Sequence, residues 1–391
     1  MSLPYHILYI QPYAYKSGPH QSLRELVSNL DRTQFAPSVV LQEPGAEADD
    51  FISLGAKAYF DCGIKTILRS FSPFRQSQFL TGMMSCAKRI AKLIIEQKVD
   101  LVHVNSEACW GGNFAARIAK TPAVSHLHGL SVLSPYLVGR LTMFILNNFS
   151  NVLISVSDIV RQSYIDSGAR ANKIRTVHNG IDISIFDPDN IKPTLKAELD
   201  INENVPLVGM IANFDPRKGH HNFVDACKHV LAQGYHAQFV IVGNTEIADD
   251  NSYFKQIKEK AMHLGIADSL HYTGLRSDIP NVLASLDVVV QPSLTEAGPI
   301  VPIEAMAMKR PLIVTDVEGN SEEVLNGQTG ILVPKENPKA MSDAIVKLLK
   351  DNDQAQRLGE NGRQRVLENF TNKVYANSIQ QIYKEVIELK V

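Results

Sequence analysis

A chain of 391 residues is too long for one ordinary hydrophobic core and indicates two domains. Apolar residues make up 45% and charged residues 20% of the sequence, which excludes a disordered or fibrous protein. The formal net charge of −2 argues against attraction of the whole protein to nucleic acid, so no nucleic-acid partner is expected.

The N-terminus and the cysteines bear on the compartment. The opening MSLPYHILYIQPY has no positively charged leader, and its apolar run is too short for a signal peptide or a membrane span. The four cysteines show no paired spacing, which fits free thiols in a reducing environment. We therefore expect a cytoplasmic protein.

In the first half of the chain, short apolar runs alternate with stretches of helical period. The apolar runs are 5–10, 37–42, 100–106, 122–129 and 151–157, and the helical stretches include 22–30, 111–119 and 158–168. A loop is expected after residue 42. This alternation predicts parallel βαβ units with helices on both faces of a sheet.

The pattern restarts after the proline-bearing stretch 187–193. Strands are expected at 206–212, 237–243, 269–274, 287–293 and 310–316, and helices at 220–233, 253–265 and 302–309. We predict an α/β protein with a Rossmann-like domain at 1–188 and another at 189–370. Residues 371–391 are expected to form a C-terminal helix that packs back on the first domain.

Candidate site residues follow the expected strands. In open parallel sheets, ligands bind beyond the carboxyl ends of the strands, where loops and helix N-termini meet. The residues at such points are Gly18, His128, Asn213 to Lys218, Gly274 and Glu296. The two domains are expected to face each other across a cleft that holds a pair of substrates.

The segment NFDPRKGHH places two cations, Arg217 and Lys218, just before an expected helix. Cations at a helix N-terminus oppose the helix dipole, by roughly 0.3–1 kcal/mol each, unless a bound anion offsets them. A phosphate ligand is the natural candidate. The alternative is that both side chains point into water.

The segment EAGPIVPIE holds two acids, Glu296 and Glu304. Pro299 and Pro302 prevent one helix from running through the segment, and Pro302 suits the first turn of a helix that would carry Glu304. A carboxylate can accept hydrogen bonds from two neighbouring hydroxyls of a sugar. The alternative is a helix-start charge for Glu304 and a solvated loop acid for Glu296.

The first half offers weaker signals. The turn SGPH places Gly18 after the first strand, where a tight turn explains it as well as a phosphate contact does. His126 and His128 share one face of a strand, but no third ligand of suitable spacing is evident, so we expect no metal site. His128 ends the strand and is a candidate partner for a polar substrate, or a simple loop cap.

The segment from Cys62 to Ile95 contains no acid, and its later part is amphipathic. Its cations are Lys65, Arg69, Arg75, Lys88, Arg89 and Lys92. Residues 65–98 are therefore a candidate contact with an anionic membrane surface, at the inner face of the cell membrane. The alternative is a core helix with a solvated basic face.

Taken together, these segments resemble the family 4 retaining glycosyltransferases (glycosyl transferases group 1), over nearly the whole chain. The matching pieces are SGPHQSLRELVSNL, VDLVHVNS, SHLHG, ISVSDIVRQSYIDSG, NGID, DPRKGHHNFVDA, HYTG and PSLTEAGPIVPIEAMAMKRPLIVTDVEGNSEEVLNGQTGILV. The last is the most specific, because two glutamates with seven residues between them precede a strand, a glycine turn and an acidic helix start. The resemblance implies the GT-B architecture, with two facing Rossmann-like domains and the active site in the cleft between them.

The resemblance also implies roles for the candidate residues. Glu304 is expected to bind the ribose of a nucleotide-sugar donor, Glu296 the transferred sugar, and Lys218 the diphosphate. The further donor-binding residues are Gly18, Asn213, Arg217, Gly274, Leu275, Gly298, Pro299 and Ile300, with the base near Gly274 and Leu275. His128 is expected near the sugar and the acceptor, and Glu296, Lys218 and His128 are the candidate catalytic residues.

The implied activity is metal-independent, retaining transfer of a sugar from a UDP- or GDP-linked donor to a hydroxyl of a glycan or lipid-linked glycan, without a cofactor. Such reactions build polysaccharides, lipopolysaccharide and other glycoconjugates. Asn213 and Pro299 stand where the family often has arginine and glycine, and Ser17 stands where it often has glycine. These departures motivate the alternative of a catalytically silent glycan- or nucleotide-binding partner on the same scaffold. An epimerase of similar architecture is disfavoured by NGID and the two-glutamate segment.

Overall fold

The computed structural model describes residues 3–12, 18–64, 66, 73–130, 136–245 and 250–389, without the side chains of 73–79 and 136–137. The chain divides into two compact units. Unit 1 consists of Met1–Gly180 and Asn372–Val391, and unit 2 of Ile181–Thr371. Each unit is built on a parallel sheet with helices between its strands, which confirms the predicted α/β class.

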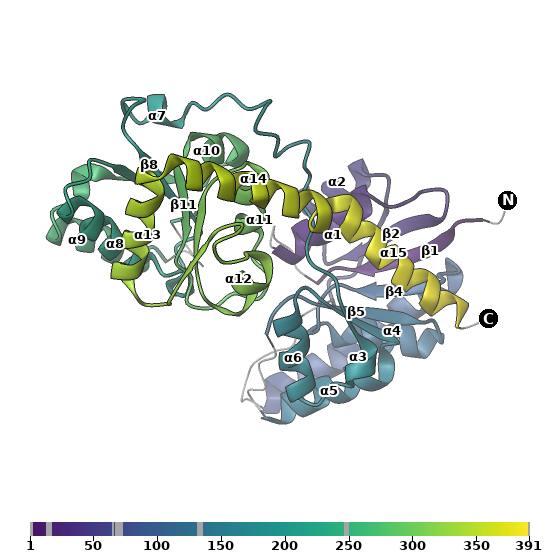
Figure 1. Cartoon of the computed structure of the whole chain (residues 1–391). Coiled ribbons are helices and arrows are strands. Elements are labelled where there is room, and N and C mark those ends of the chain that lie inside the picture. Colours follow the sequence, from purple (N-terminus) through teal and green to yellow (C-terminus); the bar gives the residue numbers. More distant parts are fainter. Residues whose placement is uncertain are drawn as a thin grey trace. The chain divides into compact units, whose positions relative to one another are not determined.

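Within its described residues, unit 1 has a seven-stranded sheet in the order β3-β2-β1-β4-β5-β6-β7 (Figure 1). The strands are β1 Tyr5–Ile10, β2 Phe35–Leu41, β3 Lys57–Phe60, β4 Leu101–Val104, β5 Ala123–Leu127, β6 Val152–Ser155 and β7 Ile174–Thr176. The helices are α1 Gly18–Ser28, α2 Ala46–Ser53, α3 Pro73–Glu96, α4 Trp110–Ala119, α5 Tyr136–Phe149, α6 Asp158–Asp166 and α15 Asn372–Glu388, with a 3-10 turn at Ala171–Lys173.

Both faces of this sheet are covered, as the alternation of side chains along β1 shows. Ile7 and Tyr9 pack into a core with residues of α1, α2 and α15, whereas Leu8 and Ile10 pack into a second core with α3 and α4. Tyr383 of α15 is fully buried in the first of these cores. The C-terminal helix, yellow in Figure 1, therefore lies beside the purple N-terminal elements β1 and α1.

The described part of unit 2 contains a six-stranded sheet in the order β10-β9-β8-β11-β12-β13. The strands are β8 Leu207–Ile211, β9 Gln238–Val242, β10 Leu270–Gly274, β11 Val288–Gln291, β12 Leu312–Thr315 and β13 Ile331–Val333. The helices are α7 Leu195–Glu198, α8 His220–Ala232, α9 Ser252–His263, α10 Ile279–Ser285, α11 Ile300–Ala307, α12 Glu318–Glu323, α13 Pro338–Lys350 and α14 Asn352–Asn369, with 3-10 turns at Pro216–Lys218 and Ala267–Ser269.

The strands of unit 2 are apolar throughout because they are buried on both faces. In β9, Phe239 and Ile241 pack toward α8, α9 and α13, and Val240 and Val242 pack toward α10, α11 and α14. All pairings in the sheet are parallel. The carboxyl ends of β8, β10, β11 and β12 therefore lie at the same end of the sheet, where the loops with the candidate residues begin.

Two local expectations were wrong. The stretch after residue 42 is not all loop, since it contains α2 and the edge strand β3. Helix α11 begins at Ile300, with Pro299 as its N-cap residue at φ −76° and ψ 139°, and not at Pro302. Glu304 therefore lies in the second turn of α11 and not in the first, where the dipole would have stabilised its charge most.

Candidate active site

In unit 2, the loop after β8 packs closely on the loop after β11. Gly219, between the turn Pro216–Lys218 and α8, has φ 75°, and a Cβ atom on it would lie 1.9 Å from the carbonyl oxygen of Pro292. The Leu294 amide also donates a hydrogen bond to the Arg217 carbonyl, at 2.7 Å. Only glycine permits this approach, which brings Lys218 within reach of Glu296.

We expect Gly219→Ala to destabilise unit 2 more than Gly234→Ala does. Gly234 also has a positive φ, of 83°, but a methyl group added there would have no other atom within 4 Å. Both substitutions carry the left-handed backbone penalty of roughly 1–2 kcal/mol, and only Gly219→Ala adds a steric clash of about 1–3 kcal/mol. Urea unfolding curves of the two variants measure the difference. Equal losses would show that the Pro292 contact is unimportant.

Glu296 is the centre of a polar cluster in unit 2. Its side chain is only 8% exposed, and its Oε1 accepts hydrogen bonds from Lys218 Nζ at 2.8 Å, Gln291 Nε2 at 3.0 Å and Ser293 Oγ at 2.6 Å. Its Oε2 has no hydrogen-bond partner among the described residues. The protein thus holds the carboxylate through one oxygen and leaves the other available to a ligand.

Two buried residues, Thr315 and Asn320, form hydrogen bonds that position the segment carrying Ser293, a partner of Glu296. Thr315, at the end of β12, donates its hydroxyl proton to the Ser293 carbonyl at 2.5 Å, and Asn320 of α12 donates to the Thr315 carbonyl at 2.9 Å. Both side chains are fully buried. Sequence reasoning missed Gln291 and Ser293 as partners of Glu296. The available signal was that polar residues end an otherwise apolar strand.

Arg217 and Asn213 interact within their own loops. Arg217 forms a bidentate pair with Asp215, from Nε to Oδ1 at 3.1 Å and from Nη2 to Oδ2 at 2.6 Å, and this pairing raises the pKa of Arg217. The Asn213 side-chain oxygen accepts a hydrogen bond from the Asn244 amide at 3.0 Å. Asp215 offsets the Arg217 charge. The donor-binding roles of both residues stay predictions.

Glu304 is a carboxyl group without a partner. Glu304 is half-buried on α11, and no hydrogen bond or ion pair connects its side-chain carboxylate to any described residue. Burial raises its pKa to about 7. Next to it, the first turn of α11 begins after Gly298 and Pro299, and its leading amides, from Ile300 onward, lack intrahelical acceptors. This helix start can receive an anion.

Gly274 is the last residue of β10, and Leu275 directly follows it, at the carboxyl end of the unit 2 strands. Gly274 has φ 71°, and its carbonyl accepts a hydrogen bond from the Gly243 amide at 3.0 Å. Leu275 is 75% exposed. The next residue, Arg276, anchors the loop through Asp278 at 2.6 Å and Glu198 at 2.7 Å. The loop therefore exposes the apolar side chain of Leu275 next to a residue, Arg276, that two ion pairs hold in place.

In unit 1, His128 and the start of α1 are linked by Asn105, which sequence reasoning did not identify. His128 Nε2 lies 2.9 Å from Asn105 Oδ1, and Asn105 Nδ2 donates to the Pro19 carbonyl at 2.9 Å. Burial lowers the pKa of His128 to about 3. His128 stacks on His126 at 4.2 Å between ring centroids. The described residues hold no group of three side chains placed to bind a metal ion.

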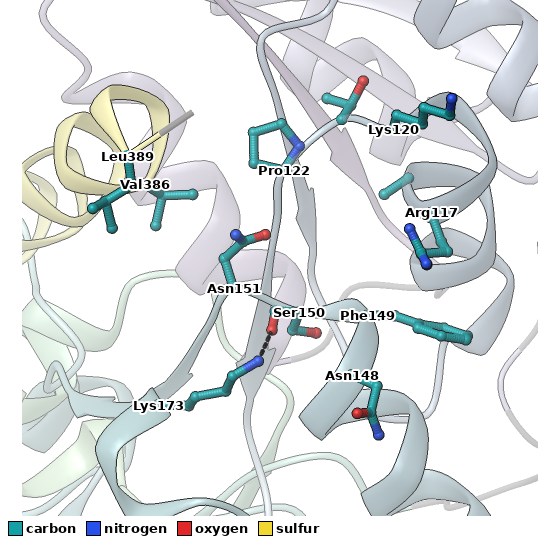
Figure 2. A pocket seen from close by; sticks show the side chains of 12 residues that line it. Arg117, Lys120, Pro122, Asn148, Phe149, Ser150, Asn151, Lys173, Val386 and Leu389 are labelled. Carbon is teal, nitrogen blue, oxygen red and sulfur yellow. Dashed lines mark hydrogen bonds between the residues drawn. The ribbon is translucent and has the colours of Figure 1, made fainter. Parts of the chain in front are cut away.

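A pocket of about 490 Å³ lies at the end of the unit 1 sheet that is opposite to His128 (Figure 2). Pro122, Asn151 and Lys173 line it and directly precede β5, β6 and β7, so it lies at the amino ends of these strands. Lys173 donates to the carbonyls of Asn147 and Ser150 at the end of α5. Cations here neutralise helix C-termini, whose dipoles disfavour an anionic ligand.

The basic surface expected on residues 65–98 is partly neutralised. Arg89 forms a bidentate pair with Asp61 at 2.8 and 2.7 Å, and Lys92 lies 3.6 Å from Glu96, while Lys88 has no partner among the described residues. Lys65, Arg69 and the side chain of Arg75 lie outside the described residues. In the part of the chain that is described, no helix has the length and apolar character needed to cross a membrane. The membrane contact stays a prediction.

Similar solved structures define the fold. A glycosyltransferase from Rickettsia africae aligns with a TM-score of 0.85 and 22% identity over 98% of this chain and 99% of that one. The Anabaena protein HepE, solved in complex with UDP and glucose, aligns with a TM-score of 0.80 and 21% identity over 97% and 99%. The two parallel-sheet units are thus a GT-B fold, as the resemblance implied.

Residues 17–185 match the family described as Glycosyltransferase Family 4, and residues 191–365 match Glycosyl transferases group 1. The chain belongs to this family of glycosyltransferases. One relative is the Escherichia coli UDP-Gal:alpha-D-GlcNAc-diphosphoundecaprenol alpha-1,3-galactosyltransferase, 26% identical over 97% of both chains. Another is the Campylobacter jejuni N,N'-diacetylbacillosaminyl-diphospho-undecaprenol alpha-1,3-N-acetylgalactosaminyltransferase, 27% identical over 84% of this chain and 88% of the relative.

Proposed function

We propose that this glycosyltransferase moves a sugar, with retention of configuration and without a metal ion, from a UDP-sugar to a hydroxyl of a lipid-linked glycan in polysaccharide biosynthesis. The observation that carries the proposal is the buried Glu296 carboxylate, paired with Lys218 and open at Oε2. The UDP complex of HepE supports the donor, and the diphosphoundecaprenol substrates in the names of both relatives support the acceptor.

The donor diphosphate would be held by Lys218 and by the amides that start α11. A lysine ammonium has three donor protons, and Glu296 uses one of them in the present structure. A helix N-terminus adds aligned amides and the positive end of its dipole. Together they would stabilise the charge on the departing nucleoside diphosphate, which is the role that a divalent ion plays in other enzymes.

Glu296 and Glu304 would bind hydroxyls at the two ends of the donor, Glu296 on the transferred sugar and Glu304 on the ribose. Leu275, with its exposed side chain at the end of β10, would cover the base. Gly298, Pro299 and the amide of Ile300 would lie along the diphosphate. Gly18 and His128 of unit 1 would contact the diphosphate and the sugar or acceptor, respectively.

The binding of UDP-glucose is expected to strengthen about tenfold between pH 6 and pH 8. The pKa of Glu304 is raised to about 7, so the fraction that is ionised, and can accept hydrogen bonds from two hydroxyls, rises over this range. The phosphates of a nucleotide sugar do not titrate there. Calorimetric titrations of the parent and of Glu304→Gln test the claim, and a parent as flat with pH as the variant would refute it.

A direct test of the function is the release of nucleoside diphosphate from a panel of UDP- and GDP-sugars, with undecaprenyl-diphosphate-linked sugars as acceptors. We expect release that depends on the acceptor, and NMR of the product should show the anomeric configuration of the donor. Binding of the donor without release for any acceptor would instead support the silent partner suggested by Asn213 and Pro299.

A further inference from the structure

Asn105 lies at the end of β4 in unit 1 and is fully buried. Its Nδ2 lies 2.9 Å from the Pro19 carbonyl oxygen and 2.8 Å from Gln11 Oε1. A backbone carbonyl can only accept a hydrogen bond, so the atom that faces it must be the amide nitrogen of Asn105. This contact fixes the orientation of the amide, and Oδ1 must point toward His128.

The orientation of Asn105 determines where the proton of His128 lies. An amide oxygen is only an acceptor, so His128 Nε2, 2.9 Å from it, must carry a proton. A neutral imidazole has one N–H, which leaves a lone pair on Nδ1. Among the described residues, Nδ1 has no partner.

We propose that Asn105 is a positioning residue that holds His128 in the neutral Nε2–H tautomer, so that Nδ1 accepts a hydrogen bond from a hydroxyl of the sugar donor or the acceptor. This assignment rests on the proposed function for its substrate, but the tautomer itself does not.

The surroundings of His128 favour the neutral ring. Its face stacks on the His126 ring, 4.2 Å away between centroids, which fixes the ring plane. The His126 ring in turn lies 5.4 Å from the His103 ring between centroids, at an interplanar angle of 53°, and no carboxylate is bonded to any of the three rings in the described residues. Burial lowers the pKa of all three imidazoles. The hydrogen bond from His128 therefore goes to a neutral amide, and nothing stabilises a second proton.

The tautomer can be read by NMR of the full chain labelled with ¹⁵N-histidine, with the His128 signals assigned from their loss in His128→Gln. We expect a protonated Nε2 and an unprotonated Nδ1 at pH 7.5. A protonated Nδ1, or a doubly protonated ring, would overturn the proposal whatever the activity of the enzyme.

Two variants at position 105 connect the tautomer to transfer. Asn105→Asp replaces the amide with a carboxylate, which should protonate both ring nitrogens at pH 7.5 and lower kcat at least tenfold while the KM for the donor changes less than threefold. Asn105→Leu should give mixed tautomers and a smaller kcat loss. Asn113→Leu, a buried asparagine of α4 bonded to Ser125 and Ser150, controls for lost packing.

The NMR and kinetic results distinguish a failure of the proposed function from a failure of the role assigned to His128. A parent with the expected tautomer but no transfer with any acceptor would refute the proposed function and leave the positioning of His128 standing. A kcat in Asn105→Asp equal to that of the parent, with a doubly protonated His128, would show that Nδ1 accepts nothing from the substrate.

Discussion

Replacing Glu296 with glutamine is expected to lower kcat for sugar transfer about 100-fold and to change the affinity for UDP less than threefold. The substitution keeps the shape of the side chain but removes the charge that Lys218 Nζ meets at 2.8 Å. Hydrogen bonds to a charged group contribute about 1.5–3 kcal/mol, and about 2.7 kcal/mol corresponds to a factor of 100. The effect is expected on kcat because the proposed contact of Glu296 is to the transferred sugar and not to the nucleotide.

The experiment compares product formation under saturating donor with UDP binding by calorimetry. Glu360→Gln, on an exposed turn of α14, is the matched control, since it makes the same chemical change in the same unit away from Glu296. It should leave kcat within twofold. An unchanged kcat in Glu296→Gln would remove Glu296 from the site. Equal urea midpoints for both variants would show that the loss is not one of folding.

Ser293→Ala tests the role of the Glu296 carboxylate more mildly, because it removes one of the hydrogen bonds that hold the carboxylate and keeps its charge. Ser293 donates to Glu296 Oε1 at 2.6 Å from a fully buried position, so its removal leaves the carboxylate with two donors in place of three. A loss of about 1 kcal/mol, or roughly fivefold in kcat, is the expected size for one hydrogen bond. A loss of kcat smaller than that of Glu296→Gln but larger than that of the control would show that the hydrogen bond from Ser293 helps to position the Glu296 carboxylate.

The two sheets could be predicted because burial on both faces leaves a strong trace in the sequence. Runs such as VVVQPS and AQFVIVG are apolar at successive positions, and the intervening helices alternate with them. The segment with α2 and β3 lacks that trace. Only Ala48 and Phe51 are buried in α2, and β3 lies at the edge of the sheet, so neither needs an apolar sequence.

The candidate site was predictable only where it is contiguous in the chain. Glu296 and Glu304 stand in one segment, and Lys218 lies in a recognisable turn. Gln291 sits five residues from Glu296, yet the fold and not the spacing makes it a donor to that carboxylate. Asn105 reaches a histidine and a helix start that lie far from it in the sequence, which no local pattern shows.

The start of α11 shows how a correct rule can place a residue wrongly. Proline suits the first turn of a helix, and Pro302 does lie in the first turn of α11. The helix nevertheless begins at Ile300, because Pro299 takes the extended conformation of an N-cap residue. Glu304 is consequently one turn further in, where burial and not the dipole governs its pKa.

Three neighbouring histidines, His103, His126 and His128, are expected to make unit 1 sensitive to acid. His103 and His126 are almost completely buried, and His103 Nδ1 lies 2.6 Å from the Tyr383 hydroxyl of α15. Burial lowers the pKa of His103 to about 3 and that of His126 well below its ordinary value. Below pH 6.5 the unfolded chain binds protons that the folded unit does not, so stability falls as the pH falls.

Between pH 7 and pH 5, a window above the ordinary range of the carboxylates, we expect unit 1 to lose about 2 kcal/mol of unfolding free energy through His103 and a further amount through His126 and His128, whose pKa values are also lowered. Trp110, the sole tryptophan of the chain, is buried in unit 1, so its fluorescence during urea unfolding reports on this unit. In His103→Gln the loss over the same range should shrink by about 2 kcal/mol, whereas exposed His263→Gln in unit 2 should leave it unchanged. A Trp110 transition with the same midpoint at pH 7 and pH 5 would mean that the histidines are protonated in the folded unit at pH 5.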